Sequence, residues 1–263
     1  MKIYLISLEQ DIKRRKALAQ CFPQNYPKMQ WIKAINGKEL SAKEYFSYVQ
    51  QFFNIHKKII TPSEVGCTLS HIKALEAFLG TEEEYCLILE DDIFGIDESI
   101  QFIEKIIIEN KLDGVVLCGG QIPLQIEKYK LYKHIRESIF IVPKFSKKFF
   151  FGTCCYIVNK QVAKSIIEYQ LNNFTKADCW DEILGTHIDL YYIDVLQHPF
   201  EMNKSHIEKE RTILYINEPN FFKRIYKQGV FWKIYNRIRN DVFRWVLILK
   251  GHKQIHKQRE NDD

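Results

Sequence analysis

The feature that most constrains this chain is a short apolar run that ends in three adjacent acids. Residues 86–89 read CLIL, and Glu90, Asp91 and Asp92 follow them directly. A run of this length and composition is typical of a strand buried in a sheet. Because neighbouring carboxylates repel one another, we expect a cation at the end of this strand. A solvated acidic turn is the alternative, and an isolated triplet of acids would favour it.

The position of the acids suits a ligand site. In an open α/β sheet, ligands bind at the carboxyl ends of the strands. Two carboxylates at such an edge form a hard oxygen site for Mg²⁺ or Mn²⁺, to which a phosphate group can add further oxygens. The sequence therefore predicts a metal and phosphate site at residues 90–92.

The composition allows a substantial core and argues against several kinds of protein. The chain has 263 residues, of which 46% are hydrophobic, enough for one large domain or one domain with an appendage. Its seven cysteines include no C-x-x-C pair, which favours free thiols in a reducing compartment. The apolar stretch at residues 2–8 is too short for a signal peptide, and no segment reaches the roughly 18 to 20 apolar residues that a membrane span requires. We therefore expect a cytoplasmic protein.

Charge is distributed unevenly along the chain. Residues 221–263 carry 11 Lys/Arg and 4 Asp/Glu, whereas residues 1–220 carry 27 and 29. A nearly neutral body argues against a nucleic-acid-binding protein, which would need basic residues spread over a folded face. We expect one domain over residues 1–220 and a basic tail over residues 221–263.

The tail has the pattern of an amphipathic helix. Apolar residues recur on one helical face: Phe231, Ile234, Tyr235, Ile238, Val242, Trp245, Val246 and Leu249. Basic residues lie off that face: Lys233, Arg237, Arg239 and Arg244. This pattern is typical of an anchor at an anionic membrane surface, here the inner face of the cytoplasmic membrane. Packing on the domain and contact with a second subunit are the alternatives, and the sequence leaves the oligomeric state open.

Strand patterns alternate with helix patterns along the body. Asp11 is placed to cap a helix that follows a strand over residues 2–8. Thr61 and Glu64 match a capping box at the start of a helix that Gly80 is placed to end. Further strands are predicted over 31–35, 86–89, 114–120, 149–158 and 190–196, and further helices over 98–110 and 161–171. The alternation predicts an α/β fold with a central, mostly parallel sheet flanked by helices.

Two segments have weaker patterns. Residues 41–60 show no clear periodicity, and residues 121–148 are basic and poorly patterned. We interpret 121–148 as a long excursion, either a mobile lid or a loop that faces the acceptor. No G-x-G-x-x-G, G-x-x-x-x-G-K-[ST], G-x-S-x-G or H-E-x-x-H motif occurs. These absences argue against nicotinamide-dependent dehydrogenases, P-loop NTPases, serine hydrolases and zincins.

Several segments, in this order, resemble glycosyltransferase family 25, the bacterial lipooligosaccharide galactosyltransferase family. The resemblance covers roughly residues 1 to 205. It is carried by Ile6-Ser7-Leu8 with Arg14-Arg15, Ala34-Ile35-Asn36-Gly37, Glu64-Val65-Gly66-Cys67-Thr68-Leu69-Ser70-His71, Leu89-Glu90-Asp91-Asp92, Gly152-Thr153-Cys154-Cys155-Tyr156-Ile157 and Ala177-Asp178. The element E-x-G-C-x-x-S-H followed by E-D-D is more specific than any single piece. The resemblance implies a GT-A-like fold and an inverting enzyme that moves a hexose, with galactose expected, from a UDP-sugar to a lipooligosaccharide or other glycan.

The resemblance also implies roles for individual residues. Glu90, Asp91 and Asp92 stand where the family has its variant of the D-x-D motif, so Asp92 is expected to bind Mn²⁺ or Mg²⁺, with Asp91 on the metal or the ribose. The residues expected on the nucleotide-sugar side are Ser7, Leu8, Arg14, Arg15, Ser70, His71, Glu90, Asp91, Gly152 and Thr153. Taken by themselves, residues 13–16 could equally be a solvated helix face and His71 a structural histidine. The match thins beyond Pro199, so it assigns no role to His198 or His206.

Inverting transfer needs a base that takes the proton of the acceptor hydroxyl. Asp178 is the first candidate and Asp181 the second, although Asp178 could also be a turn or capping acid. Two other functions stay open at this point. One is an inactive scaffold that keeps the fold and binds membrane or partner enzymes, and the other is a metal-dependent phosphohydrolase of nucleotide sugars.

Overall fold

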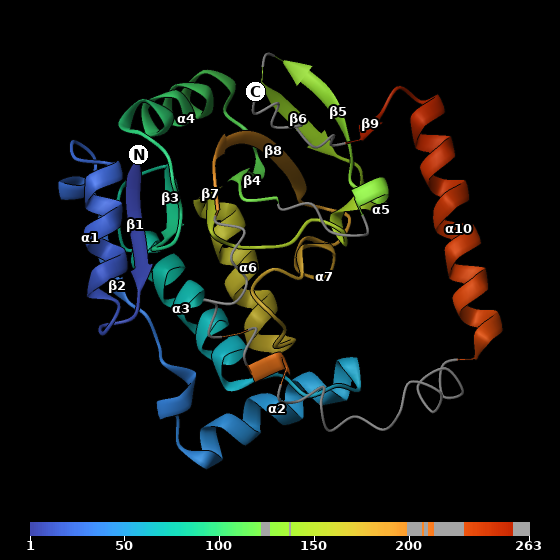
Figure 1. Cartoon of the computed structure of the whole chain (residues 1–263), viewed down its shortest axis with the longest axis horizontal. Coiled ribbons are helices and arrows are strands. Elements are labelled where there is room, and N and C mark those ends of the chain that lie inside the picture. Colours follow the sequence, from blue (N-terminus) through green and yellow to red (C-terminus); the bar gives the residue numbers. More distant parts are fainter. Residues whose placement is uncertain (122–126, 137, 199–206, 208–209, 213–228, 255–263) are drawn as a thin grey trace, which may run out of the picture.

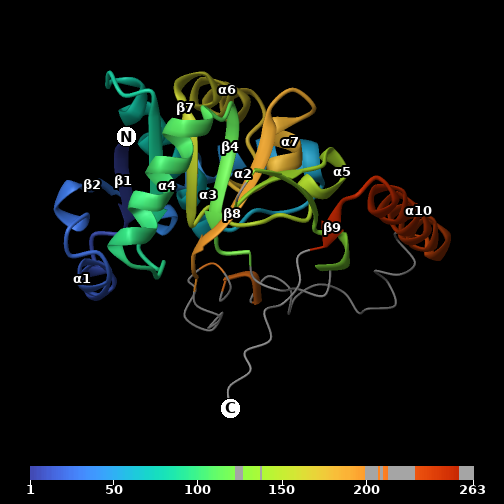
Figure 2. The ribbon, with the colours of Figure 1, turned by 90° about the horizontal axis from the view of Figure 1, so that it is seen from above.

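The computed structural model describes residues 1–121, 127–136, 138–198, 207, 210–212 and 229–254. These residues form a nine-stranded sheet with helices on both faces (Figure 1, Figure 2). The strands are β1 (Lys2–Ser7), β2 (Gln30–Lys33), β3 (Tyr85–Glu90), β4 (Gly114–Gly119), β5 (Leu131–Arg136), β6 (Ile139–Val142), β7 (Cys155–Asn159), β8 (Asp189–Leu196) and β9 (Lys253–Gln254). The α-helices are α1 (Ile12–Cys21), α2 (Ala42–His56), α3 (Pro62–Leu79), α4 (Asp97–Asn110), α5 (Lys144–Lys147), α6 (Lys160–Asn172), α7 (Trp180–Leu184) and α10 (Val230–Leu249). Short 3-10 turns are η1 (Tyr26–Lys28), η2 (Gly37–Glu39) and η3 (Glu127–Tyr129).

The predicted α/β class is confirmed, but the sheet is more mixed than expected. Its strand order is β2-β1-β3-β7-β4-β8-β6-β5-β9. Parallel pairing joins β1 to β2, β1 to β3 and β4 to β8. β7 lies antiparallel between β3 and β4, and the remaining pairs from β8 to β9 are also antiparallel. Because β7 is antiparallel to both of its neighbours, β3 and β4 are parallel to each other. β1, β3, β4 and β8 therefore all point the same way, and their carboxyl ends meet at one edge of the sheet.

Alternation along the strands explains the two layers of helices. Tyr4 and Ile6 of β1 contribute to the hydrophobic cluster beneath α3, α6 and α7, whereas Ile3 and Leu5 contribute to the cluster beneath α1 and α4. Since successive side chains of a strand point to opposite faces, a strand that is apolar throughout must be covered on both. The uninterrupted apolar runs in the sequence therefore produce a sheet buried between two layers.

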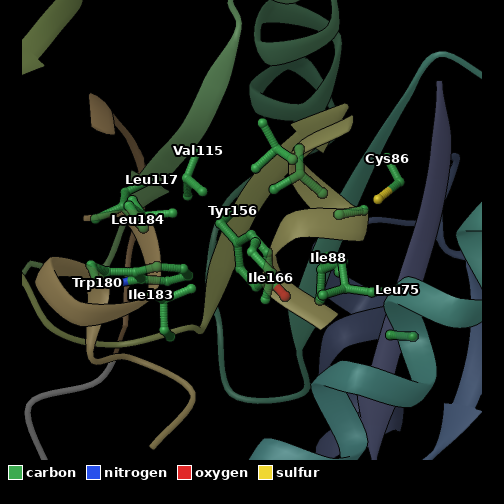
Figure 3. Close-up of a cluster of buried hydrophobic side chains, with 14 of the residues drawn as sticks. Leu75, Cys86, Ile88, Val115, Leu117, Tyr156, Ile166, Trp180, Ile183 and Leu184 are labelled. Carbon is green, nitrogen blue, oxygen red and sulfur yellow. The ribbon is translucent and has the colours of Figure 1, made fainter. Parts of the chain in front are cut away.

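Figure 3 shows the first of these clusters, where helix and strand side chains interlock. Trp180 and Leu184 of α7 lie against Leu117, and Leu75 of α3 lies against Ile88. Trp180 is almost fully buried. Burying a side chain of this size contributes on the order of 2–3 kcal/mol of hydrophobic free energy, so the short helix α7 is fixed firmly to the sheet.

Helix α3 begins and ends where the sequence predicts. The Thr61 hydroxyl accepts from the Glu64 backbone N–H, and the Glu64 carboxylate accepts from the Thr61 N–H at 2.9 Å. Gly80 follows the last helical residue. Reciprocal capping satisfies two backbone donors that the first turn leaves without partners.

Three segments differ from the prediction. Residues 42–56 form α2, which starts with a second capping box between Ser41 and Glu44. The described part of 121–148 contains η3, β5, β6 and α5 and extends the sheet, so it is not the loop that we expected. The strand predicted over 149–158 starts only at Cys155. All seven cysteines are free, as predicted.

Helix α10 confirms the predicted helical character of the tail. It lies beside α5 and β9 at one end of the molecule, and β1 and β2 lie at the other (Figure 1). Among the described residues, no helix is long and apolar enough to cross a bilayer. The predicted boundary near residue 220 falls outside the described residues and stays a prediction.

Candidate functional site

The end of β3 brings two of the predicted acids into a buried position. Asp91 is only 7% exposed, and Asp92 is partly buried beside it. Asp91 Oδ2 and Asp92 Oδ1 are buried and have no hydrogen-bond partner among the described residues. A buried acceptor without a partner is unfavourable by about 1–3 kcal/mol, and more when it is charged. These oxygens therefore fit a hard divalent cation, which prefers carboxylate ligands.

Two basic side chains flank this pair. Arg14 Nε lies 3.0 Å from Asp91 Oδ1, and an amino group of the same guanidinium contacts Asp92 Oδ2. His198 Nε2 lies 3.2 Å from the same Asp92 oxygen. Arg14 comes from the first turn of α1, directly after β1, and His198 comes two residues after β8. Elements from three parts of the chain thus converge on the acids.

The two carboxylates have different electrostatic surroundings. Burial raises the pKa of Asp91 to about 6, although Arg14 and the Ser7 hydroxyl act in the opposite direction. Burial also disfavours the Asp92 carboxylate, but His198 and Arg14 outweigh it and lower the pKa of Asp92. A bound cation would favour the ionised form of both.

Arg15 is fixed at the end of β1 by its neighbours. Its guanidinium donates to Ser7 Oγ at 2.8 Å, to the Leu8 carbonyl and to the Glu9 carbonyl at 2.9 Å. It also stacks 4.4 Å from the centre of the Trp31 ring. The structure therefore brings the predicted residues Ser7, Leu8 and Arg15 together next to Arg14.

Glu90 joins three elements beneath the site. Its Oε1 accepts from the Thr153 hydroxyl at 2.7 Å and lies 3.3 Å from His71 Nε2. His71 Nδ1 lies 3.1 Å from the Tyr156 hydroxyl. One consistent arrangement has Tyr156 donating to His71 and His71 donating to Glu90. His71 and Glu90 thus position α3 against β3 and β7.

Cys67 lies next to this group. Its thiol, a ring nitrogen of His71 and a carboxylate oxygen of Glu90 all lie within 4.8 Å of one another. Both His71 nitrogens already have partners, and burial raises the pKa of the Cys67 thiol well above its usual value. Glu90 Oε1 also accepts from Thr153, whereas Asp91 and Asp92 each keep an oxygen that has no partner among the described residues, so these two acids are the better metal site.

The candidate base Asp178 is connected to the same region through residues 152–153. The Gly152 N–H donates to Asp178 Oδ2 at 3.1 Å, and the Trp180 indole donates to the Gly152 carbonyl at 3.3 Å. Asp178 is partly buried. The next residue along, Thr153, is the one that binds Glu90.

Asp181 is in a different setting. It is exposed in the first turn of α7 and lies close enough to Lys147 and Lys148 to affect their pKa values. The contacts around Glu90 and Gly152 do not include it, whereas they do include Asp178.

Ser70 and two glycines join α3 to the turn after β2. The Ser70 hydroxyl accepts from the Ile35 N–H at 2.8 Å. A Cβ on Gly66 would lie 2.5 Å from the Ile35 carbonyl oxygen and 2.6 Å from the Gly37 nitrogen. Ser70 therefore serves this backbone contact in the structure, and its expected nucleotide role stays a prediction.

His198 is the site residue that the sequence did not assign. Backbone hydrogen bonds of 2.7 and 2.9 Å pair Phe94 with Gln197, and this bridge brings the residue after Gln197 beside Asp92. The available signal was a histidine just beyond an apolar strand, at the same sheet edge as the acids. His206 lies outside the described residues.

Comparisons with known proteins identify the family of this chain. Residues 1–184 match the family model of glycosyltransferase family 25 (LPS biosynthesis protein). A glycosyltransferase 25 family member of Anopheles gambiae is 32% identical over 96 residues, which are 35% of this chain and 16% of that protein. A glycosyltransferase 25 family member of Aedes aegypti is 31% identical over 96 residues, which are again 35% of this chain and 16% of that protein. The match thus spans about a sixth of these relatives.

A solved inositol-1-phosphate CTP transferase from T. maritima is similar at a TM-score of 0.40 and 11% identity, covering 83% of this chain and 97% of that one. Likeness at this level adds nothing to the assignment.

The family match covers well over half of the chain and contains β1, the turn after β2, α3 and the acids that follow β3. The chain belongs to glycosyltransferase family 25.

Proposed function

We propose that this protein is a metal-dependent, inverting glycosyltransferase that moves a hexose, with galactose expected, from a UDP-sugar to a lipooligosaccharide or other glycan acceptor. The observation that carries the proposal is a pair of buried oxygens on Asp91 and Asp92, at the carboxyl edge of the sheet, that have no hydrogen-bond partner in the described part of the chain. Family membership supports glycosyl transfer, and the acids supply the reason to propose a metal.

Asp91 and Asp92 would hold Mn²⁺ or Mg²⁺, and His198 Nε2 is near enough to Asp92 to join them. A divalent ion so held would stabilise the negative charge that develops on the leaving diphosphate. Imidazole and carboxylate together suit Mn²⁺ better than Mg²⁺, which prefers oxygen ligands alone.

Arg14 and Arg15 would bind the donor. Arg14 already contacts both acids, so its guanidinium would be available to bind the diphosphate of a donor held beside them. Its planar guanidinium can bind phosphate oxygens in pairs. Arg15 is stacked on Trp31 and donates to backbone carbonyls. It would therefore stabilise the conformation of the backbone at the end of β1, where the nucleotide would bind.

Asp178 would act as the base. The Gly152 N–H holds one of its oxygens, which fixes the carboxylate and leaves the other oxygen able to take the acceptor proton. Inversion requires this base and no covalent intermediate. Asp181 is the weaker candidate because it is exposed beside lysines away from the Glu90 contacts.

Titration of the purified protein with UDP, with and without Mn²⁺, tests the metal proposal. We expect binding that strengthens at least about tenfold with Mn²⁺ and loses that gain in Asp92→Asn, because one charged ligand is removed. Asp189→Asn is the matched control, since Asp189 is exposed at the amino end of β8, away from the acids. Equal affinity with and without Mn²⁺ would contradict the proposal and favour a scaffold.

Analysis of the reaction products distinguishes a glycosyltransferase from a phosphohydrolase. A glycosyltransferase releases UDP from a UDP-sugar in proportion to added acceptor. A phosphohydrolase would use water to cleave the diphosphate into UMP and sugar 1-phosphate, at the same rate whether or not acceptor is present. The proposed location is cytoplasmic, at the inner face of the membrane that carries a lipid-linked acceptor.

A further inference from the structure

Helix α10 is attached to the domain by its polar side. Asp241 Oδ1 accepts from Lys128 Nζ at 2.7 Å and from the Tyr129 hydroxyl at 2.8 Å. Arg244 Nε donates to the Lys128 carbonyl at 3.0 Å. Phe243 adds an aromatic contact, with its ring centre 5.4 Å from that of Phe145. These contacts fix which side of the helix faces the domain.

The opposite side of α10 is apolar and faces outward. The exposed fractions of its side chains run from 40% at Val246 to 85% at Leu249. The stripe comprises Ile234, Tyr235, Ile238, Val242, Trp245, Val246 and Leu249. A surface helix of a globular protein normally turns such a stripe toward the core. Here the polar side holds the helix in place and the apolar stripe is left exposed, an arrangement that suits a further contact.

Basic residues flank the stripe on both sides. Arg237 lies on one flank, and Arg239 and Lys250 lie on the other, all of them exposed. The helix contains one acid, Asp241, and it is already paired with Lys128. The charged residues beside the stripe that are fully exposed, Arg237, Arg239 and Lys250, are therefore all cations. Tyr235 and Trp245 also have the apolar bodies and polar tips that are favoured at a bilayer interface.

We propose that the outward face of α10 docks on an anionic lipid surface, with the helix lying in the plane of the headgroups. An apolar stripe between rows of cations is the pattern that binds such surfaces. The helix is about 30 Å long at 1.5 Å per residue, yet it carries four Lys/Arg in 20 residues and so does not span the bilayer.

A second copy of the chain fits this face less well. In a symmetric contact the same patch meets itself. Two copies of the stripe would then bring Arg237 and Arg239 of one copy close to the same cations of the other. Like charges at a contact are unfavourable, whereas acidic headgroups would neutralise them.

Co-sedimentation of the full chain with vesicles tests the proposal without donor, metal or acceptor. We expect binding to vesicles of phosphatidylcholine and phosphatidylglycerol, much weaker binding to phosphatidylcholine alone, and weakening as salt rises. Failure to bind the anionic vesicles at low salt would overturn the proposal. Because no catalysis is measured, this result is independent of the proposed transferase activity.

Two double variants measure separately how much the apolar stripe and the basic residues contribute to vesicle binding. Trp245→Glu/Leu249→Glu should weaken vesicle binding at least about tenfold, because two interfacial side chains become charged. Ile108→Glu/Leu171→Glu is the matched control, since Ile108 on α4 is 61% exposed and Leu171 on α6 is 68% exposed. Arg237→Gln/Arg239→Gln should weaken binding about 25-fold, since each basic residue near an anionic surface adds about fivefold in affinity. Lys43→Gln/Lys164→Gln, on α2 and α6, is the control of equal charge.

Each remaining outcome is decisive. If the controls weaken binding as much as the α10 variants, attraction is general and the proposal fails. If Trp245→Glu/Leu249→Glu instead abolishes a dimer seen by light scattering while vesicle binding is unchanged, the stripe is a contact between copies. Circular dichroism of every variant checks that the fold is retained.

Discussion

Glu90 follows a buried run and precedes two acids, yet its contacts differ from theirs. Within the residues that the structure describes, Asp91 and Asp92 each keep one oxygen without a partner, whereas Glu90 Oε1 accepts from Thr153 and lies beside His71. Three neighbouring acids thus divide into one that connects elements and two that face the proposed cation. The sequence located the triplet, but adjacent residues with the same charge give no sign of which one points into the protein.

Replacing Glu90 tests its positioning role. Glu90→Ala leaves the Thr153 hydroxyl and His71 without their acceptor, and we expect a loss of about 1–3 kcal/mol in the free energy of unfolding. Glu90→Gln keeps an oxygen for Thr153 and should cost less. Urea denaturation measures both, with Glu98→Ala on the exposed side of α4 as control. Equal stability of Glu90→Ala and the control would contradict the role.

The two candidate bases can be separated by kinetics. We expect Asp178→Asn to lower kcat by about 10²- to 10⁴-fold, the range attributed to general-base catalysis, with little change in UDP affinity. Asp181→Asn should change kcat only slightly, because Asp181 is exposed beside Lys147 and Lys148. The reverse ranking of the two variants would assign the base to Asp181.

Among the elements, α3 is central because it meets both the turn after β2 and the strands of the site. Gly66 of α3 touches the backbone of Ile35 and Gly37, so no side chain fits between them. This contact gives a physical reason for the glycines in two of the segments by which the family was recognised. The contact fixes the position of α3, and with it the positions of Ser70 and His71, relative to β1 and β3.

A methyl group at Gly66 should therefore disrupt the fold. We expect Gly66→Ala to lower the free energy of unfolding by about 1–3 kcal/mol, the usual cost of overpacking, since backbone atoms cannot yield as a side chain can. Gly80→Ala is the control, because a Cβ there would lie 3.5 Å from its nearest neighbour. Thermal unfolding of the two variants provides the measurement, and similar melting temperatures would argue against close packing at Gly66.

The first turn of α3 also predicts how stability depends on pH. Glu64 is buried, which disfavours its charge, but Lys176, Arg211 and the Thr61 N–H outweigh burial and lower its pKa below the ordinary 4.5. A carboxylate with a lowered pKa in the folded state stabilises the protein above the ordinary value and loses that contribution as pH falls through the lowered one. We expect unfolding free energy to fall below about pH 4.5, and Glu64→Gln to flatten that decline. An unchanged slope in Glu64→Gln, measured by urea titrations between pH 7 and 3, would remove Glu64 as the cause.

Over the whole molecule, local signals predicted more than long-range ones. The capping box at Thr61 and the apolar run before Glu90 are local, and α3 and β3 lie where they indicated. The same capping signature occurs at Ser41 and Glu44, and Tyr45, Tyr48, Val49 and Phe52 follow it at helical spacing and pack in one cluster, so the sequence also contains a local signal for α2. The antiparallel insertion of β7 and the approach of His198 to Asp92 depend on contacts between residues about 70 to 106 positions apart, which periodicity does not encode.

The body and α10 are joined by a small set of contacts, and Asp241 is central to them. Asp241→Asn removes the charge that pairs with Lys128, so we expect α10 to detach more often and limited proteolysis to cut residues 229–254 faster. The melting temperature of the body should change little, because its clusters lie within the sheet and helices α1 to α7. Arg239→Gln is the control, since Arg239 is exposed and stacks on Tyr235 of the same helix. Cleavage at the same rate in both variants would mean that the ion pair does not hold the helix, and that the other contacts, such as Phe243 on Phe145 and Arg244 on the Lys128 carbonyl, do.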